Sequence, residues 1–312
     1  MRGVVSAGMV VALEQLALVN TFDAIYGSSG GAMNAAYLLA GQAVLGTSIY
    51  YENINNRSFI DFLRPLRGQP IIDLDFLVGD VMERAKRLDV DAVLASPAPL
   101  NVLATHLPSG KRDVFRSWTD RQDFLRSLRA GASMPVFAGS PYPFRDGQYW
   151  DALLSEPIPV AVAEEDGCTH VVALMTRPLG TVGPKMSWTE RLYVVPKLQR
   201  ESPGLAERYA IRGQQYASTL TSLWNGRGPL GRARVLPIGP AGPAVSKLER
   251  RQGRLVDGAA QGFRAVATAF GVEVASFVET IAGFDVTGRR LSPSGSAAPS
   301  QDAHPWPLLP TR

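Results

Sequence analysis

Two patterns of hydrophobic positions alternate along the chain. Runs with apolar residues three or four positions apart, typical of amphipathic helices, cover residues 4–17, 30–53, 74–86, 119–130, 203–224 and 256–271. Shorter apolar runs, typical of buried strands, cover residues 22–27, 99–106, 112–116, 169–176 and 232–237. This alternation predicts an α/β fold of three layers, a sheet with helices on both faces.

The C-terminal segment has a different composition. From about residue 284 the chain becomes rich in Ser, Pro, Ala and Gly, and it ends in Pro305-Trp306-Pro307-Leu308-Leu309-Pro310. Such a segment buries too little apolar surface to offset the entropy lost on ordering. We therefore expect one domain over residues 1–283 and a disordered tail over residues 284–312.

Composition narrows the class of protein. With 312 residues, 46% of them hydrophobic, the chain is long enough to fill a sizeable core. The net charge of +4 is mild, so it does not indicate nucleic-acid binding, although it is compatible with attraction to anionic lipid. The single cysteine, Cys168, excludes an intramolecular disulfide. Without a signal-peptide pattern or a run of eighteen apolar residues, we expect a cytoplasmic protein that meets lipid at a surface.

The most informative motif is Gly27-Ser28-Ser29-Gly30-Gly31, which lies between a strand-like run and a helix of small residues. This layout is that of a nucleophile elbow, with Ser29 raised at the N-terminus of the helix. Backbone N–H groups and the helix dipole there favour the negative charge of an acyl-transfer intermediate. We expect glycine at 27 and 31 because a side chain at either position would collide across the tight turn.

Two further segments carry chemistry only in combination with the elbow. Arg2-Gly3 opens the first helix, where backbone donors can face an oxyanion, although alone it is more typical of a plain buried helix. Asp146-Gly147 is a turn between apolar stretches, and an aspartate on such a turn more often accepts its own backbone N–H groups.

In this order, the three segments resemble the patatin-like phospholipase family. That family has a glycine-rich loop ending in Arg-Gly, then the elbow, then an Asp-Gly-Gly or Asp-Gly-Ala turn with the second catalytic residue. The flanks fit too, since small residues and Pro135-Val136-Phe137 precede the turn, and Asp151 with Pro157-Ile158-Pro159-Val160 resembles the D-x-x-P-V that follows it. The resemblance covers roughly residues 1–280.

The chain departs from the family pattern at two places. Gln148 stands where the family has Gly or Ala. The sequence also begins inside the first motif, so a strand and two or three glycines that family members carry have no counterpart. From the otherwise intact motifs we expect that the start has been placed too late.

The resemblance implies a serine acyl hydrolase that cleaves carboxylic ester bonds of phospholipids or related acylglycerols through an acyl-enzyme. It requires no cofactor and no metal. The implied site has Ser29 as nucleophile and Asp146 as general base in a Ser-Asp dyad. The other implied site residues are Arg2, Gly3 and Gly30 in the oxyanion hole, Gly27, Ser28 and Gly31 in the elbow, and Gly147 and Gln148 in the aspartate turn.

Two other functions stay open at the level of sequence. An α/β-hydrolase esterase would use a Ser-Asp-His triad, for which the chain offers His106, His170 and, in the expected tail, His304. A non-catalytic patatin-like module would bind lipid or a partner without cleaving it.

The segment 57–67 combines Phe59, Ile60, Phe62, Leu63 and Leu66 with three arginines. It fits an interfacial element that touches lipid headgroups. It fits equally a core segment whose arginines are solvated.

Overall fold

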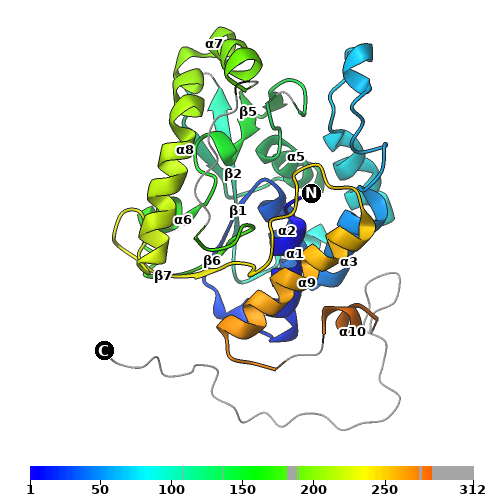
Figure 1. Cartoon of the computed structure of the whole chain (residues 1–312), viewed down its shortest axis with the longest axis vertical. Helices are drawn as coiled ribbons and strands as arrows, with labels where there is room; N and C mark the ends of the chain where they lie inside the picture. Colours follow the sequence, from blue (N-terminus) through cyan, green and yellow to red (C-terminus); the bar gives the residue numbers. More distant parts are fainter. Residues whose placement is uncertain (108, 136, 181–187, 189, 274–275, 283–312) are drawn as a thin grey trace.

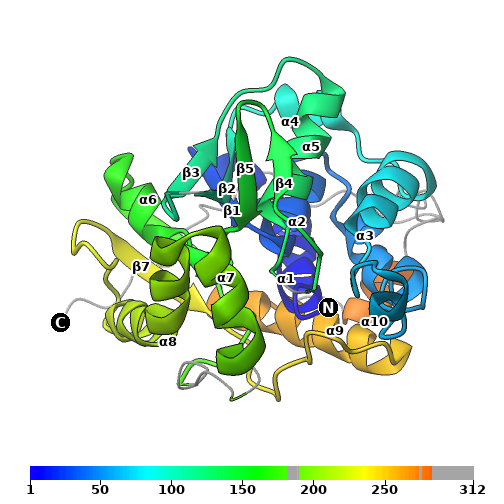
Figure 2. The ribbon, with the colours of Figure 1, turned by 90° about the horizontal axis from the view of Figure 1, so that it is seen from above.

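The computed structural model describes residues 1–107, 109–135, 137–180, 188, 190–273 and 276–282. The expected disordered tail lies outside these residues. Within them, a mixed sheet is packed between helices (Figures 1 and 2), which confirms the predicted α/β class.

Five strands form the main sheet. β1 (Ile25–Ser28) runs parallel to β2 (Leu100–Leu107), and β2 pairs antiparallel with both β3 (Arg112–Phe115) and β5 (Gly147–Asp151). β4 (Tyr142–Phe144) pairs antiparallel with β5. A separate two-stranded parallel sheet joins β6 (His170–Leu174) to β7 (Arg234–Ile238).

The register of β2 brings the ends of β1 and β5 together. On β2, residues 100–103 pair with β1 and residues 104–107 pair with β5. β3 pairs with residues 102–105 of β2, so it overlaps both of these spans. Because a strand has two edges, β1 and β5 must share the edge opposite β3. They approach one another along it, so that Ser28 lies opposite Leu103 and Asp151 opposite Ala104.

Alternate side chains of β2 fill the cores on the two faces of the sheet. Val102 and Ala104 belong to the core that includes α2 (Gly30–Leu39) and α5 (Arg121–Gly131). Leu103 instead packs with Val162 of α6 (Val160–Glu165). The period of two residues in a strand thus produces the three layers.

The other helices are α1 (Val4–Gln15), α3 (Ala43–Ser48), α4 (Val90–Leu94), α7 (Val195–Glu201), α8 (Pro203–Trp224), α9 (Gln252–Ala269) and α10 (Phe277–Ala282). Short 3₁₀ segments are η1 (Val19–Thr21), η3 (Arg64–Arg67) and η5 (Ala152–Leu154), and π-helical segments are η2 (Ile49–Asn53), η4 (Phe76–Ala85) and η6 (Glu190–Val194). None of the helices in the described part of the chain combines the length and apolarity needed to cross a bilayer.

The structure differs from the sequence-based elements at several places, among them the unpredicted short helices α4, α6 and α7. The helix expected over 30–53 is divided, because Gly41 adopts a left-handed φ of 65° between α2 and α3. The hairpin of β4 and β5 was not predicted, and Arg145 and Asp146 form its two-residue turn between the paired Phe144 and Gly147.

Helices α1 and α9 touch through their backbones. A Cβ added to Gly8 would lie 1.9 Å from the carbonyl oxygen of Ala259, and one added to Gly262 would lie 1.8 Å from that of Val5. Glycine is therefore required at both positions for this approach.

We expect Gly262→Ala to lower the free energy of unfolding by about 1–3 kcal/mol, since the helices must separate to admit a methyl group. Urea unfolding followed by circular dichroism measures the change. Gly253→Ala is the matched control, because a Cβ on this glycine of α9 meets nothing within 4 Å, and we expect it to be neutral or stabilising. Equal stability of the two variants would contradict the close packing.

Candidate active site

Ser29 lies at the sharp turn between β1 and α2. Its backbone has φ 55° and ψ −132°, a conformation that non-glycine residues rarely adopt and that is typical of functional turns. A Cβ on Gly27 would lie 2.4 Å from the Cα of Ala32, so glycine is needed there, as expected. The same expectation is wrong for Gly31, where an added Cβ meets nothing within 4 Å. Ser28 turns the other way, and its hydroxyl donates to the carbonyl oxygen of Glu156 at 3.1 Å.

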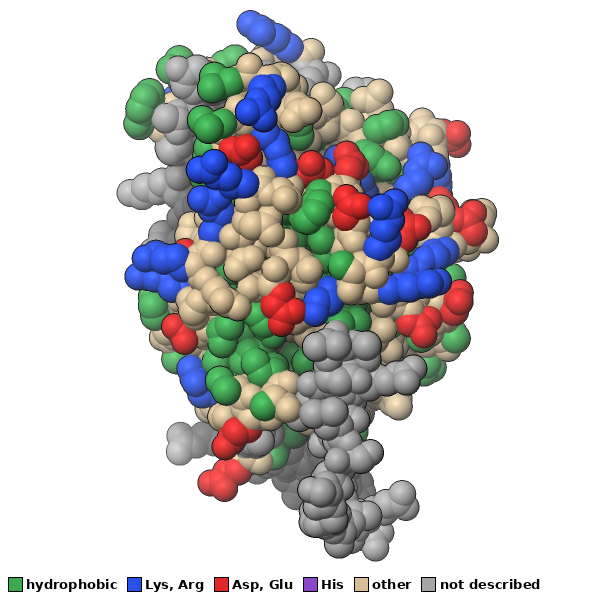
Figure 3. Space-filling view, turned by 90° about the vertical axis from the view of Figure 1, so that its right-hand side faces the viewer, with side chains coloured by type: hydrophobic (Ala, Val, Ile, Leu, Met, Phe, Trp, Pro, Cys, Tyr) green, Lys and Arg blue, Asp and Glu red, His purple; other side chains and the backbone are tan. Residues whose placement is uncertain are grey.

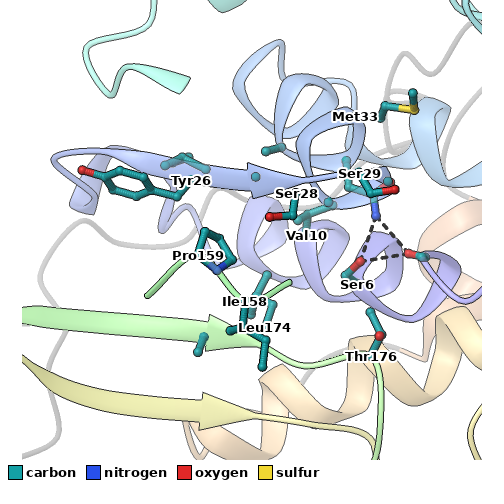
Figure 4. A pocket seen from close by; sticks show the side chains of 18 of the residues that line it. Ser6, Val10, Tyr26, Ser28, Ser29, Met33, Ile158, Pro159, Leu174 and Thr176 are labelled. Carbon is teal, nitrogen blue, oxygen red and sulfur yellow. Dashed lines mark hydrogen bonds between the residues drawn. The ribbon is translucent and has the colours of Figure 1, made fainter. Parts of the chain in front are cut away.

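The N-termini of α1 and α2 meet beside Ser29. Both Gly3 and Gly30 lie against the hydroxyl oxygen of Tyr50, which would be 2.6 Å and 3.2 Å from a Cβ on each. Asn34 of α2 ties the two together, because its Nδ2 donates to the carbonyl oxygen of Gly3 at 2.9 Å and to Ser6 Oγ at 3.0 Å. Figure 4 shows this network of hydrogen bonds directly beside Ser29. The N–H groups of Val4 and Val5 already donate to the carbonyl oxygens of Met1 and Arg2. The backbone around Gly3 and Gly30 therefore offers the candidate donors beside Ser29.

Arg2, the other residue expected in the oxyanion hole, uses its side chain elsewhere. Its Nε donates to the carbonyl oxygen of Val245 at 3.3 Å. Burial lowers the pKa of the Arg2 guanidinium, and the nearby charge of Arg177 lowers it further. Arg2 and Arg177 are therefore two neighbouring cations at the site.

The carboxyl group closest to the elbow belongs to Asp151, the last residue of β5. The side chain is completely buried, and its Oδ1 accepts the N–H of Leu153 at 2.8 Å. Burial raises its pKa to about 6, while the Ser29 hydroxyl, as hydrogen-bond donor, lowers it in part. Asp151 Oδ2 has no partner at full hydrogen-bond geometry. The interaction of Ser29 with Asp151 is therefore looser than an ordinary hydrogen bond, as is common for catalytic pairs before substrate binds.

The expected pairing of Ser29 with Asp146 is wrong in its geometry. Asp146 is exposed in the hairpin turn, and with Gly147 it lines a separate small hollow that also contains His106 and Asp113. Gln148 is likewise exposed, paired with Leu107 of β2. The turn lies at one end of β5 and Asp151 at the other, four residue steps away, which is about 13 Å along a strand.

Histidine does not complete a triad within the part of the chain that the structure describes. His106 Nδ1 lies 3.0 Å from Ser109 Oγ in the hollow beside Asp146. His170 begins β6 at an exposed position, 3.1 Å from the hydroxyl of Thr169, although it lines the far part of the same cavity as Ser29. The third, His304, lies outside the described residues.

A cavity of about 1540 Å³ opens beside Ser29 and Asp151. Its walls are largely apolar, and side chains from β1, from the loop before α6 and from β6 line it (Figure 4), among them Tyr26, Ile158, Pro159 and Leu174, while α2 contributes Met33. Arg2 and Arg177 lie on the same wall. The site thus combines a serine hydroxyl, a buried carboxyl, two neighbouring helix N-termini and an apolar cavity.

Comparison with known proteins identifies the family of the chain. The model of the family "Patatin-like phospholipase" matches residues 1–164, more than half of the chain. The chain belongs to the patatin-like phospholipase family. A curated relative, the "Uncharacterized protein YjjU" of Escherichia coli (strain K12), is 27% identical over 181 residues, which cover 57% of this chain and 49% of the relative. The chain therefore spans about half the length of this relative.

Motif matching used Asp151 only as a flank of the aspartate turn, but the sequence of this patatin-like chain contained a further signal for it. Trp150, Asp151 and Ala152 lie in one apolar run and are all completely buried. Burying a carboxyl group is costly unless it is paired or functional. An aspartate inside an apolar run is thus a stronger indication of a site than one in a solvated Asp-Gly turn.

Proposed function

We propose that this patatin-like protein is a serine acyl hydrolase that cleaves carboxylic ester bonds of lipids through Ser29 and Asp151. The observation that carries the proposal is the position of the strained elbow serine beside a fully buried carboxyl group, one oxygen of which has no hydrogen-bond partner. A serine hydroxyl becomes an effective nucleophile only when a base takes its proton. Asp151 replaces Asp146 in this role.

In the proposed reaction, Ser29 Oγ bonds to the ester carbonyl carbon while its proton passes to Asp151. Backbone N–H groups near Gly3 and Gly30 stabilise the resulting oxyanion. The intermediate expels the alcohol, which receives the proton from Asp151. Water then attacks the acyl-enzyme by the same route, with Asp151 first accepting a proton and then returning it to Ser29. A fatty acid leaves, and both residues are restored.

The cavity supports a lipid substrate that carries an anionic group. The apolar walls suit an acyl chain. Arg177 packs over the ring of Tyr216, 6.0 Å from its centroid, and lies near Arg2. Neither arginine forms an ion pair with any residue in the described ranges. Two partly buried cations side by side repel one another, and a phosphate group would relieve this repulsion.

The experiment is hydrolysis of phosphatidylglycerol by the purified chain, with the released fatty acid measured by mass spectrometry. We expect turnover by the wild type and a KM about tenfold higher for Arg177→Ala, because a charge-assisted hydrogen bond to the substrate is lost. The KM for a neutral short-chain ester should stay unchanged.

The control variant is Arg84→Ala, which removes an exposed arginine paired with Asp80. If phosphatidylglycerol is not cleaved, the proposed substrate class is wrong. If Arg177→Ala leaves its KM unchanged, the anionic subsite is wrong.

A further inference from the structure

A protrusion of the chain, residues 61–71, stands away from the sheet and displays apolar side chains. In Figure 1 it lies at the upper right, in the colours between residues 50 and 100. Its two ends are held together at the base, where Ile60 and Ile72 form an antiparallel bridge and the N–H of Asp61 donates to the carbonyl oxygen of Ile71 at 2.9 Å. Ile72 is in turn bonded to the body of the protein, its N–H donating to the carbonyl oxygen of Phe137 at 2.8 Å.

Arg64 holds the protrusion in this conformation. Its guanidinium donates to the carbonyl oxygens of Arg57, Ser58 and Phe59, and it lies 3.7 Å from the carboxylate of Asp73. Asp61 Oδ1 accepts the N–H of Leu63 at 2.9 Å. These bonds join residues before and after the protrusion, so its shape is set by the fold and not by contacts of its apolar residues.

Three large apolar side chains project from this framework into solvent. The exposed fractions are 54% for Phe62, 54% for Leu63 and 84% for Leu66. Single exposed leucines are ordinary on protein surfaces, but three such residues within five positions form a cluster, and clusters of this kind mark interaction sites.

The charges of residues 57–67 are net positive, with three arginines against the single carboxylate of Asp61. Arg57 and Arg67 are exposed on either side, and neither forms an ion pair with any residue that the structure describes. Arg64 already has its partner in Asp73. Figure 3 shows this side of the molecule, with hydrophobic, basic and acidic side chains in its upper half. An apolar cluster flanked by unpaired arginines complements a membrane with anionic headgroups, because the apolar side chains can enter the interface while the arginines meet the negative charges.

The base of the protrusion is part of the cavity that contains Ser29. Phe59 and Ile72, the residues at its two ends, both line that cavity, as do Met134 and Ala138 beneath it. A lipid surface in contact with Leu63 and Leu66 would therefore lie at one end of the proposed acyl-chain site.

We propose that the protrusion, residues 61–71, is a membrane-docking element, which inserts Phe62, Leu63 and Leu66 into the interface of an anionic bilayer while Arg67 and the neighbouring Arg57 contact its headgroups. The docking element would bring the cavity to its lipid substrate, and in that respect the inference rests on the proposed function.

The test is co-sedimentation with vesicles of phosphatidylcholine, with and without phosphatidylglycerol. All proteins carry Ser29→Ala, so that binding is measured without hydrolysis. We expect binding to the phosphatidylglycerol vesicles, a loss of about tenfold or more in partitioning for Leu63→Ser with Leu66→Ser, and a loss of about tenfold for Arg57→Gln with Arg67→Gln. The arginine variant should bind vesicles of pure phosphatidylcholine as its parent does.

The matched control is Leu94→Ser with Leu230→Ser, which removes two leucines of 42% and 44% exposure that lie outside the protrusion; it should bind as its parent does. Unchanged binding of the Leu63/Leu66 variant, or no binding of the parent, would overturn the proposal. A concentration-dependent dimer that the Leu63/Leu66 variant abolishes would also overturn it, since the occupant would then be a second copy of the chain.

A catalytic control uses proteins that keep Ser29. In them, the Leu63/Leu66 variant should cleave a soluble short-chain ester as the wild type does. Docking and catalysis can therefore fail independently.

Discussion

Ser29→Ala is expected to retain less than about one thousandth of the wild-type turnover of a short-chain ester, since removing the nucleophile of a serine hydrolase costs several orders of magnitude. The same variant should lose covalent labelling by a fluorophosphonate probe. Loss of the hydroxyl removes no buried hydrogen bond of full geometry, because Asp151 Oδ2 has no such partner. The fold should therefore be unchanged by circular dichroism.

Ser28→Ala is the matched control for this substitution. Ser28 is the neighbouring serine of the same elbow, but its hydroxyl donates to the carbonyl oxygen of Glu156. We expect this variant to keep the probe label and most of the turnover. Labelling that persists in Ser29→Ala and disappears in Ser28→Ala would show that Ser28, and not Ser29, is the nucleophile.

Asp151→Asn is expected to reduce turnover by about three to four orders of magnitude, nearly as much as Ser29→Ala. The amide keeps the size of the side chain and can still accept the N–H of Leu153, but it cannot take the proton of Ser29. The double variant should be no worse than either single one, because residues that act as one unit have non-additive effects.

Asp146→Asn is the control for Asp151→Asn, and it decides between the two aspartates. Asp146 lies in the solvent-exposed hairpin turn, so we expect turnover within about twofold of wild type, as is usual for surface positions. A large loss in Asp146→Asn with little loss in Asp151→Asn would restore the pairing expected from the motif.

The pH dependence of the wild type tests the same assignment. Burial raises the pKa of Asp151 to about 6, and a general base must be ionised to act. The kcat/KM for the short-chain ester should therefore rise with pH, with a midpoint of about 6. A plateau that extends unchanged to pH values well below this midpoint would contradict the role of Asp151.

The raised pKa of Asp151 also predicts a change in stability. Between the unfolded value of 3.8 and the folded value of about 6, the folded protein binds more protons than the unfolded chain. The protonated Asp151 therefore contributes its full stabilisation below the unfolded pKa. This stabilisation, about 3 kcal/mol of unfolding free energy, is lost as pH rises through the folded pKa. At pH 8, Asp151→Asn should unfold at a urea concentration no lower than the wild type does.

Local sequence determined much of this molecule. The apolar runs over residues 22–27 and 99–106 predicted both strands to within one to three residues of the observed bounds, Ile25–Ser28 and Leu100–Leu107, because a strand buried on both faces needs a continuous apolar run. The elbow was equally local, since its turn, its glycine at 27 and the helix that follows are neighbours in the chain. Family membership followed from the order of these segments.

Contacts between distant segments decided what the sequence left open. Asp146 matched a familiar motif, but its turn only joins β4 to β5, while β2 aligns the end of β5 with the end of β1. The partner of Ser29 depends on which strands share an edge, and no local pattern encodes this. The exposure of Phe62, Leu63 and Leu66 was likewise undecided, because the sequence of residues 57–67 fitted a core segment as well as a surface one. Burial depends on what packs against a side chain, so only the tertiary structure could place Asp151 inside and these three residues outside.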